Sequence, residues 1–288
     1  MKIIDNIEEM KLELSYHQDK QIGFVPTMGF LHDGHLSLVE ESVKKNDLTV
    51  LSIFVNPLQF GPNEDFETYP RDAKRDASLA ESHGVDIIFI PTSKVMYPEK
   101  MTFAIEVTEK ADVLCGKNRP GHFDGVVTVL LKLFNIVQPT NAYFGMKDAQ
   151  QLAIVYTFVE QFNLPVNIVG LATVRENSGL AKSSRNIYLS DHEKHLANSI
   201  YTSLNYGAEL IKSKEYNAKV ILDNVRKKFL ETSNIDYEYL ELLSFPDLED
   251  VTEVNSTIVL AIAVKYSKAR LIDNLIINKY GEVLTKFN

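Results

Sequence analysis

Residues 22–45 read IGFVPTMGFLHDGHLSLVEESVKK, and this stretch decides the fold of the first half of the chain. The apolar run at 22–25 indicates a buried strand, and residues 35–45 have the pattern of a helix. Gly29 and Gly34 lie between the strand and the body of the helix. The start of such a helix offers free backbone N–H groups and the positive end of its dipole to an anion.

The same alternation of strand and helix continues along the chain. Continuous apolar runs such as 53–55 and 87–90 indicate strands buried on both faces, the pattern of a parallel sheet flanked by helices. We therefore expect an α/β domain with a doubly wound, Rossmann-like parallel sheet that binds ligands at the carboxyl ends of its strands. The expected strands are 22–25, 49–55, 86–90, 141–144 and 166–169, and the expected helices are 35–45, 71–83, 123–138 and 148–162.

After residue 173 the pattern changes. Two helical stretches come first, and three strands follow them closely. Helices followed by clustered strands indicate a smaller α+β domain. We therefore predict two domains, residues 1–173 and residues 174–288. The helices expected in the second domain are 191–211 and 217–232, and the strands are 237–243, 257–264 and 270–276.

Composition narrows the class of protein. The 288 residues are 45% hydrophobic and 24% charged, with a formal net charge of −9. A nucleic-acid surface needs clustered Lys and Arg, so we expect no nucleic-acid partner, although a few cations can still bind a small anion. The single cysteine, Cys115, excludes an internal disulfide framework and fits a reducing compartment. The N-terminus lacks the apolar core of a signal peptide, and the apolar stretch 126–137 is too short to cross a bilayer. We expect a cytoplasmic protein with no membrane partner.

Two histidines lie at the start of the helix expected at 35–45. His32 and His35 are three residues apart and so share one face of a helical turn. Each can donate a hydrogen bond to a phosphate oxygen and favour the charge of a pentacovalent phosphorus centre. Gly34 leaves room for a base or ribose to approach the backbone. Spacing alone favours two ordinary surface histidines, but their place behind the first strand and Pro-Thr-Met-Gly favours a nucleotide site.

The segment HDGH at 32–35 resembles the H-x-G-H signature of the nucleotidylyltransferase superfamily, which includes class I aminoacyl-tRNA synthetases. The longer string PTMGFLHDGHLSLV at 26–39 is similar to one family within it, the pantothenate synthetases. Four further segments resemble that family in the same order. They are FVNPLQFGPNEDFETYPR at 54–71, RPGHFDGVVTVLLKLFNIVQP at 119–139, YFGMKDAQQL at 143–152 and TVRENSGLAKSSRNIYLS at 173–190.

The resemblance implies an ATP site with His35, His32 and Lys147 as its catalytic residues. The residues it assigns to ATP are Met28, Gly29, His32, Gly34, His35, Gly145, Met146, Lys147, Asp148, Val174, Lys182, Ser183, Ser184 and Arg185. Lys147 supplies a point charge, Asp148 can accept from a ribose hydroxyl, and Val174 matches a position that packs near adenine. The loop 182–185 suits a triphosphate tail and departing pyrophosphate. The family usually has an apolar residue in the place of Lys182.

The resemblance assigns the second substrate site to two glutamines. Gln59 and Gln151 match positions that bind pantoate and β-alanine in the family. A neutral amide at these places can orient a hydroxyl and a carboxylate, and Asn56 adds a further neutral donor and acceptor. The segment 119–139 is interpreted mainly as a packed helix that corroborates the family.

Two half-reactions follow from the resemblance. The carboxylate of pantoate attacks the α-phosphorus of Mg-ATP, which gives pantoyl adenylate and pyrophosphate. The amine of β-alanine then attacks the mixed anhydride and releases pantothenate and AMP. The protein would contribute positioning and charge stabilisation. Mg²⁺ is expected to be held largely by phosphate oxygens and water, with no dedicated metal site in the protein. The family also implies a homodimer.

Two other classes of protein fit parts of the pattern. A plain nucleotidylyltransferase shares H-x-G-H, but it would need basic residues for its acceptor phosphate where this chain has Asn56 and Gln59. A tRNA-binding synthetase remnant would need a basic stripe, which the last 100 residues lack, and the charge of −9 speaks against it. Retention on heparin would distinguish this last alternative.

Overall fold

The computed structural model of the chain describes residues 1–62 and 64–288, and these residues form two sheets. Strand order in the first sheet is β1-β4-β3-β2-β5-β6-β10, and its neighbours are parallel except for β6 and β10. The strands are β1 (Lys2–Ile4), β2 (Ile22–Thr27), β3 (Leu48–Ile53), β4 (Ile87–Phe89), β5 (Asn141–Gly145), β6 (Asn167–Leu171) and β10 (Lys286–Phe287). The order reverses between β2 and β5, because β3 and β4 extend the sheet on one side and β6 extends it on the other.

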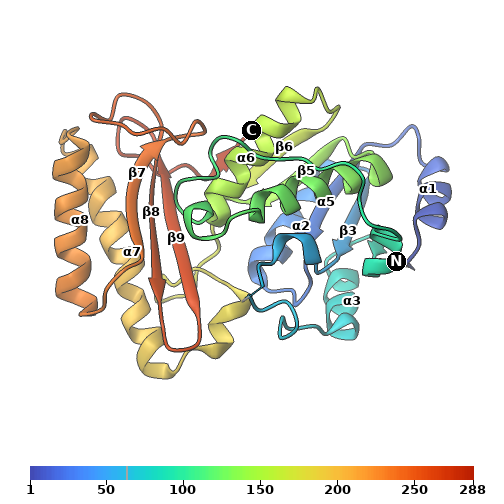
Figure 1. The fold of residues 1–288 in the computed structure, drawn as a ribbon, viewed down its shortest axis with the longest axis horizontal. Coiled ribbons are helices and arrows are strands. Elements are labelled where there is room, and N and C mark those ends of the chain that lie inside the picture. Colours follow the sequence, from blue (N-terminus) through green and yellow to red (C-terminus); the bar gives the residue numbers. More distant parts are fainter. Residues whose placement is uncertain (63) are drawn as a thin grey trace.

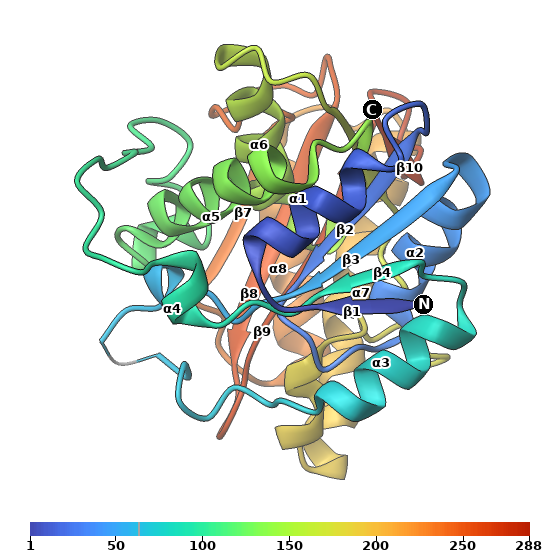
Figure 2. The ribbon, with the colours of Figure 1, turned by 90° about the vertical axis from the view of Figure 1, so that its right-hand side faces the viewer.

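Helices cover both faces of the first sheet (Figure 2). Helices α2 and α3 pack on one face, and α1, α5 and α6 pack on the other. Their bounds are α1 (Ile7–Ser15), α2 (Asp33–Lys45), α3 (Ala73–Ser82), α5 (His122–Val137) and α6 (Ala149–Gln161). Neighbouring side chains of a strand enter different cores, so Phe24 packs with α5 and α6 while Val25 packs on the α2 side. Burial on both faces explains the continuous apolar sequence of β4, and every residue of β3, Thr49 and Ser52 included, is buried as well.

The second sheet is antiparallel and consists of β7 (Tyr239–Ser244), β8 (Ile258–Lys265) and β9 (Arg270–Ile277). One face packs against α7 (Asp191–Lys212) and α8 (Ala218–Ser233), and the other packs onto the core that α5 and α6 share. Leu260 therefore faces α7 and α8, whereas its neighbour Ala261 faces α5 and α6. Figure 1 shows the sheet between these two groups of helices.

Short helical segments connect the longer elements. They are η1 (Pro57–Gln59), α4 (Ser93–Met96), η2 (Gly116–Asn118), η3 (Met146–Asp148) and η4 (Ser184–Tyr188), of which all but α4 are 3₁₀ helices. Segment η1 follows β3, and η3 follows β5 directly. Both therefore lie at the carboxyl ends of the parallel strands, where the sheet can present their side chains to a ligand.

The predicted fold class is confirmed: a mainly parallel, doubly wound sheet is joined to a smaller α+β part. The predicted helices and strands are present with shifted ends. The elements β1, α1 and β10 were not predicted, and neither were α4 and the short 3₁₀ helices. Strand β10 pairs with β6, so the last residues join the first sheet, and the division between residues 173 and 174 stays a prediction. Among the described residues, no helix is both long and apolar enough to cross a membrane.

Candidate active site

A pocket opens at the carboxyl ends of β3, β2, β5 and β6, across the point where the strand order reverses. In open α/β sheets this is the edge at which ligands bind. The pocket brings together most of the predicted site residues from segments far apart in the sequence. Those that line it are Met28, His32, Gly34, His35, Gln59, Gly145, Lys147, Asp148, Gln151, Val174, Lys182, Ser183, Ser184 and Arg185.

Two predicted site residues, Gly29 and Met146, do not line this pocket. Gly29 has a φ of +84°, and a Cβ at this position would lie 2.8 Å from Cγ2 of Ile53. Met146 is 3% exposed and packs into the core beneath η3. Both residues therefore shape the loops around the pocket from behind.

The loop that precedes the histidines is held by Asp76 of α3. This carboxylate is 1% exposed and accepts hydrogen bonds from the backbone N–H of Phe30 (2.6 Å) and of Leu31 (2.8 Å). Hydrogen bonds to a charged group each contribute about 1.5–3 kcal/mol. They offset the backbone strain of Phe30, whose φ is +51° and which costs about 1–3 kcal/mol. Asp76 thus fixes the path of the chain into His32.

His32 and His35 cap the N-terminus of α2 with their own side chains. Nδ1 of His32 accepts from the backbone N–H of Gly34 (3.1 Å), and Nδ1 of His35 accepts from the backbone N–H of His32 (3.4 Å). The rings stack with their centroids 4.1 Å apart. A neutral imidazole that accepts at Nδ1 carries its proton on Nε2. Both histidines therefore offer an Nε2–H group as a donor.

The surroundings keep both imidazoles neutral. Burial, with Lys147 nearby, lowers the pKa of His32 to about 4. Burial also lowers the pKa of His35 to about 3, assisted by His32 and Lys147. At neutral pH the pair can donate hydrogen bonds without carrying charge, and it has no proton to release as an acid.

Gln59 is oriented by a buried neighbour. Asn56, 1% exposed, donates from Nδ2 to Oε1 of Gln59 (3.1 Å) and to the carbonyl oxygen of Gly125 (3.0 Å). Because Oε1 is occupied, the NH₂ group of Gln59 lies on the other side, where Nε2 is 3.4 Å from the sulfur of Met28. Both of these residues line the pocket, so Gln59 presents a donor to it. Gly125 allows the contact between α5 and η1, since a Cβ there would lie 2.4 Å from the carbonyl oxygen of Leu58.

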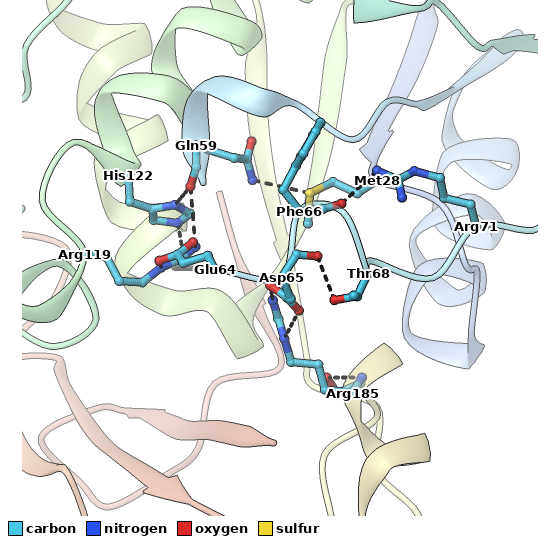
Figure 3. Close-up of polar contacts among 11 residues, drawn as sticks. Met28, Gln59, Glu64, Asp65, Phe66, Thr68, Arg71, Arg119, His122 and Arg185 are labelled. Atoms are coloured by element: carbon cyan, nitrogen blue, oxygen red, sulfur yellow. Dashed lines mark hydrogen bonds and ion pairs between the residues drawn. The ribbon is translucent and has the colours of Figure 1, made fainter. Parts of the chain in front are cut away.

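Arg119 and His122 also line the pocket, although their segment was expected to be mainly structural. Nδ1 of His122 lies 2.8 Å from the carbonyl oxygen of Gln59, and Arg119 Nη1 lies 2.9 Å from His122 Nε2 (Figure 3). The guanidinium of Arg119 also donates to both carboxylate oxygens of Glu64. Burial acts to raise the pKa of Glu64, but the hydrogen bond and charge of Arg119 outweigh it and lower that pKa. This network fixes the main chain of Gln59.

The cations of the pocket, which form what we call its cationic wall, are paired with carboxylates. Arg185 donates from Nε (3.1 Å) and Nη2 (3.0 Å) to the two oxygens of Asp65 (Figure 3). Lys182 Nζ lies 3.1 Å from Asp33 Oδ2, and Lys147 Nζ lies 3.6 Å from Asp148 Oδ1. These pairs hold three cations around one end of the pocket. The wall is therefore charged, whereas the histidine wall is neutral.

Apolar side chains line another part of the pocket. They come mainly from α5 and from the ends of β3 and α2, and they are Leu38, Phe54, Val126, Val129, Leu130 and Leu133. The pocket thus combines neutral histidine donors, an amide pair, apolar surface and clustered cations. Such a site suits a ligand with a phosphate chain at one end and a small, partly apolar acid at the other.

Comparison with known proteins agrees with this arrangement. The family model described as pantoate-beta-alanine ligase matches residues 2–276. A pantothenate synthetase of Bacillus pumilus is 52% identical over 278 residues, which cover 96% of this chain and 96% of that protein. One of Bacillus subtilis is 51% identical over 280 residues, covering 96% of this chain and 98% of that protein.

Solved structures show the same similarity over the whole fold. The crystal structure of pantothenate synthetase from Thermus thermophilus aligns with a TM-score of 0.91 and 39% identity, covering 97% of this chain and 100% of that chain. The pantoate-beta-alanine ligase of Francisella tularensis, complexed with beta-gamma ATP and beta-alanine, aligns with a TM-score of 0.78 and 36% identity, covering 96% of this chain and 97% of that chain. The chain therefore belongs to the pantoate–β-alanine ligase family and is an enzyme that forms an amide bond.

Proposed function

We propose that this enzyme joins pantoate to β-alanine at the expense of ATP, through a pantoyl-adenylate intermediate. The observation that carries the proposal is the composition of the pocket, which brings two neutral histidines together with two amides, apolar surface and clustered cations. The family membership supports the overall reaction, and the relative from Francisella tularensis was solved in complex with beta-gamma ATP and beta-alanine.

In the first step, a carboxylate oxygen of pantoate attacks the α-phosphorus of ATP. The bond between the α-phosphorus and the oxygen that bridges to the β-phosphate breaks, and pyrophosphate leaves. Charge builds on the α-phosphate oxygens as this happens. The Nε2–H donors of His32 and His35 are set to stabilise that charge, because their Nδ1 atoms are already occupied. Lys147 and Arg185 would hold the phosphates that leave.

The acid end suits pantoate better than an acceptor phosphate. Gln59 offers an NH₂ donor, and Gln151 lines the same pocket, so the two amides can orient a carboxylate and hydroxyls. The apolar residues of α5 can cover the two methyl groups of pantoate. Arg119 is the cation at this end, and Glu64 neutralises it. A plain nucleotidylyltransferase would need a free cation here for its second phosphate.

In the second step, the amine of β-alanine attacks the acyl carbon of the adenylate. The carbon–oxygen bond breaks and AMP leaves with its oxygen, which gives the amide of pantothenate. Adenylation makes this step possible because it turns a poor leaving oxygen into a good one. The chain needs to hold the adenylate and the amine in contact, a task of positioning.

Mg²⁺ would enter as part of the nucleotide substrate. Within residues 1–62 and 64–288 there is no group of three or more His, Cys, Asp or Glu side chains that could hold a metal ion. Mg²⁺ keeps several waters and binds readily to substrate phosphates. Asp148 lies beside Lys147 at the pocket. A single carboxylate suits a contact to a water of the hydrated ion better than direct coordination of the metal.

We further propose that the enzyme is a cytoplasmic homodimer. The lone Cys115 is consistent with a reducing compartment. An apolar groove beside α4 supports an interface with a second copy, since it includes Met101 (40% exposed) and Phe103 (84% exposed). Exposed apolar patches of this kind mark contacts between proteins. Sedimentation velocity would give the mass in solution.

The test of the reaction is incubation with ATP, pantoate and β-alanine, with AMP and pantothenate measured together. Equal amounts of the two products are expected. With pantoate alone, labelled pyrophosphate should exchange into ATP. Release of ADP, or exchange that requires β-alanine, would contradict the adenylate step.

A further inference from the structure

The second sheet contacts the segment that carries Lys147 through one residue of β9. Nδ2 of Asn274 donates to the backbone carbonyl oxygen of Lys147 at 2.6 Å. Asn274 is 5% exposed, so this bond lies in the interface between the second sheet and η3. Lys147 in turn lines the pocket beside the two histidines and, together with burial, lowers their pKa values.

The orientation of the Asn274 amide follows from its partner. A carbonyl oxygen can only accept, so the NH₂ group of Asn274 must face Lys147. Its own Oδ1 is buried and has no hydrogen-bond partner among the described residues. An unpaired buried acceptor costs free energy that an apolar residue would avoid. The hydrogen bond from Nδ2 of Asn274 to the carbonyl oxygen of Lys147 is the contact that an apolar residue could not make.

The neighbouring residue, Asp273, holds a second loop of the pocket from the other face of β9. Its oxygens accept from Nη1 (2.6 Å) and Nη2 (2.9 Å) of Arg175. Arg175 follows Val174, and the backbone N–H of Lys182 bonds to the carbonyl oxygen of Val174. Successive residues of one strand thus fix the two loops that carry the pocket's lysines.

The Lys147 side chain needs such support. Its ammonium group makes a 3.6 Å contact with Asp148, whose side chain is half exposed. A solvated pair of this kind constrains a flexible side chain weakly. The place of the charge therefore depends on where the main chain of η3 lies.

We propose that Asn274 is a positioning residue of the adenylation step, which sets the main chain of Lys147 from the second sheet. The inference rests on the proposed function, in which Lys147 contacts the phosphates of ATP. It gives the second sheet a part in the chemistry beyond packing. Misplacing a charged group by about 1 Å can cost as much as 10²-fold in rate.

The experiment compares two substitutions of Asn274 with a control in the same interface. Asn274→Asp has nearly the same shape but lacks the NH₂ donor. Asn274→Ala also removes the donor, and it does not bring a carboxylate next to the carbonyl oxygen of Lys147. Both should slow pantoate-dependent pyrophosphate exchange roughly 10- to 100-fold and leave the KM for pantoate nearly unchanged. The control is Tyr239→Phe, which removes a buried contact to Cys115 Sγ (3.2 Å) across the same interface, a contact that does not involve Lys147. It should keep the wild-type exchange rate.

A double-mutant cycle with Lys147→Ala shows whether Asn274 acts through Lys147. If it does, Asn274→Ala should add almost no further loss in the Lys147→Ala background. Equal losses in both backgrounds, or a loss in Tyr239→Phe as large as that in Asn274→Ala, would overturn the proposal and leave only a packing role. Titration with Mg-ATP distinguishes a failure of this positioning role from a failure of the proposed function. Wild type that binds ATP but shows no exchange refutes adenylation, while weaker ATP binding in Asn274→Ala still supports the positioning role.

Discussion

The two walls of the pocket hold their functional groups in opposite ways. On the histidine wall, His32 and His35 are neutral, stacked on each other and bonded to backbone N–H groups of their own helix turn. On the cationic wall, Lys182 and Arg185 carry full charges that are balanced by carboxylates far from them in the sequence, Asp33 in the histidine turn and Asp65. One wall is set by local backbone geometry, and the other by exchangeable ion pairs.

Under the proposed function, this difference separates two tasks of the adenylation step. Donors that act on the transition state need a fixed place, because reorganisation at the moment of reaction costs rate. Cations that receive a phosphate chain need a partner that a phosphate can replace, and a carboxylate in a partly exposed pair is such a partner. We therefore expect substitutions on the histidine wall to affect chemistry and those on the cationic wall to affect ATP binding as well.

The largest effect should come from the histidine wall. Alanine at His35 or His32 should slow adenylation roughly 10²–10³-fold, because each removes one preorganised donor from the α-phosphate. Single-turnover formation of pyrophosphate measures this step directly. Circular dichroism is the control for the fold, since each ring also caps α2. Wild-type rates in both variants would return the pair to a purely structural role as helix caps.

A smaller and unequal effect is expected on the cationic wall. Arg185→Ala should lower adenylation about 10²-fold, because a guanidinium grips phosphate through two donors. Lys182→Leu should lower it only severalfold, because Lys182 is a flexible point charge shared between Asp33 and Glu176. The KM for ATP should rise in both variants. A Lys182→Leu enzyme as impaired as Arg185→Ala would make Lys182 a primary phosphate ligand.

The two walls also differ in how far sequence predicted them. His32, His35 and the loop 182–185 belong to contiguous motifs, so their local spacing carried the signal. The pairing of these cations with carboxylates was not predicted, although Asp33 and Asp65 lie in the quoted segments, because the partners are far apart in the chain: Asp65 is 120 residues from Arg185. A single carboxylate in a polar loop has no periodicity or motif that could reveal such a pairing. Asn274 was missed for the same reason.

The fold shows a similar division. Buried strands such as β3 were predictable because they are rich in apolar residues and lead into unbroken apolar runs such as 53–55. Strands β1 and β10 have only three and two residues, too few for a pattern to be recognised. The apolar face of α5 presented another limit, because residues such as Val126 both belong to the buried core and line the pocket. An apolar helix does not show in its sequence which part of its surface a cavity uses.

The two glutamines, Gln59 and Gln151, offer a comparison with both walls because their amides are neutral. Gln59→Ala and Gln151→Ala should raise the KM for pantoate about tenfold and change that for ATP little, because an amide bonds a hydroxyl or carboxylate but adds no charge for phosphates. Isothermal titration with each substrate alone measures the two affinities. Gln59→Glu is a sharper variant, since its carboxylate would repel that of pantoate. A loss confined to ATP would reverse the assignment.

The smallest expected effect is on stability, and it tests whether the histidine wall is neutral. In the unfolded chain a histidine titrates near pH 6.5, whereas the folded pKa is about 4 for His32 and about 3 for His35. Between these values the unfolded state binds more protons, so the free energy of unfolding should fall as the pH drops below 6.5. Each histidine contributes at most about 1.4 kcal/mol per pH unit to that slope. His122, with a pKa lowered to about 4 by burial and by Arg119, adds to it.

Urea unfolding of wild type and His35→Ala between pH 5.5 and 7.5 would measure the slope. The variant should be less sensitive to pH than wild type but not insensitive, because His32 and His122 remain. Arg185→Ala serves as the matched control from the cationic wall: a guanidinium does not titrate in this range, so its slope should equal that of wild type. Parallel curves for wild type and His35→Ala would mean that His35 titrates normally in the fold. The histidine wall would then be charged in mildly acidic solution, and its contrast with the cationic wall would disappear there.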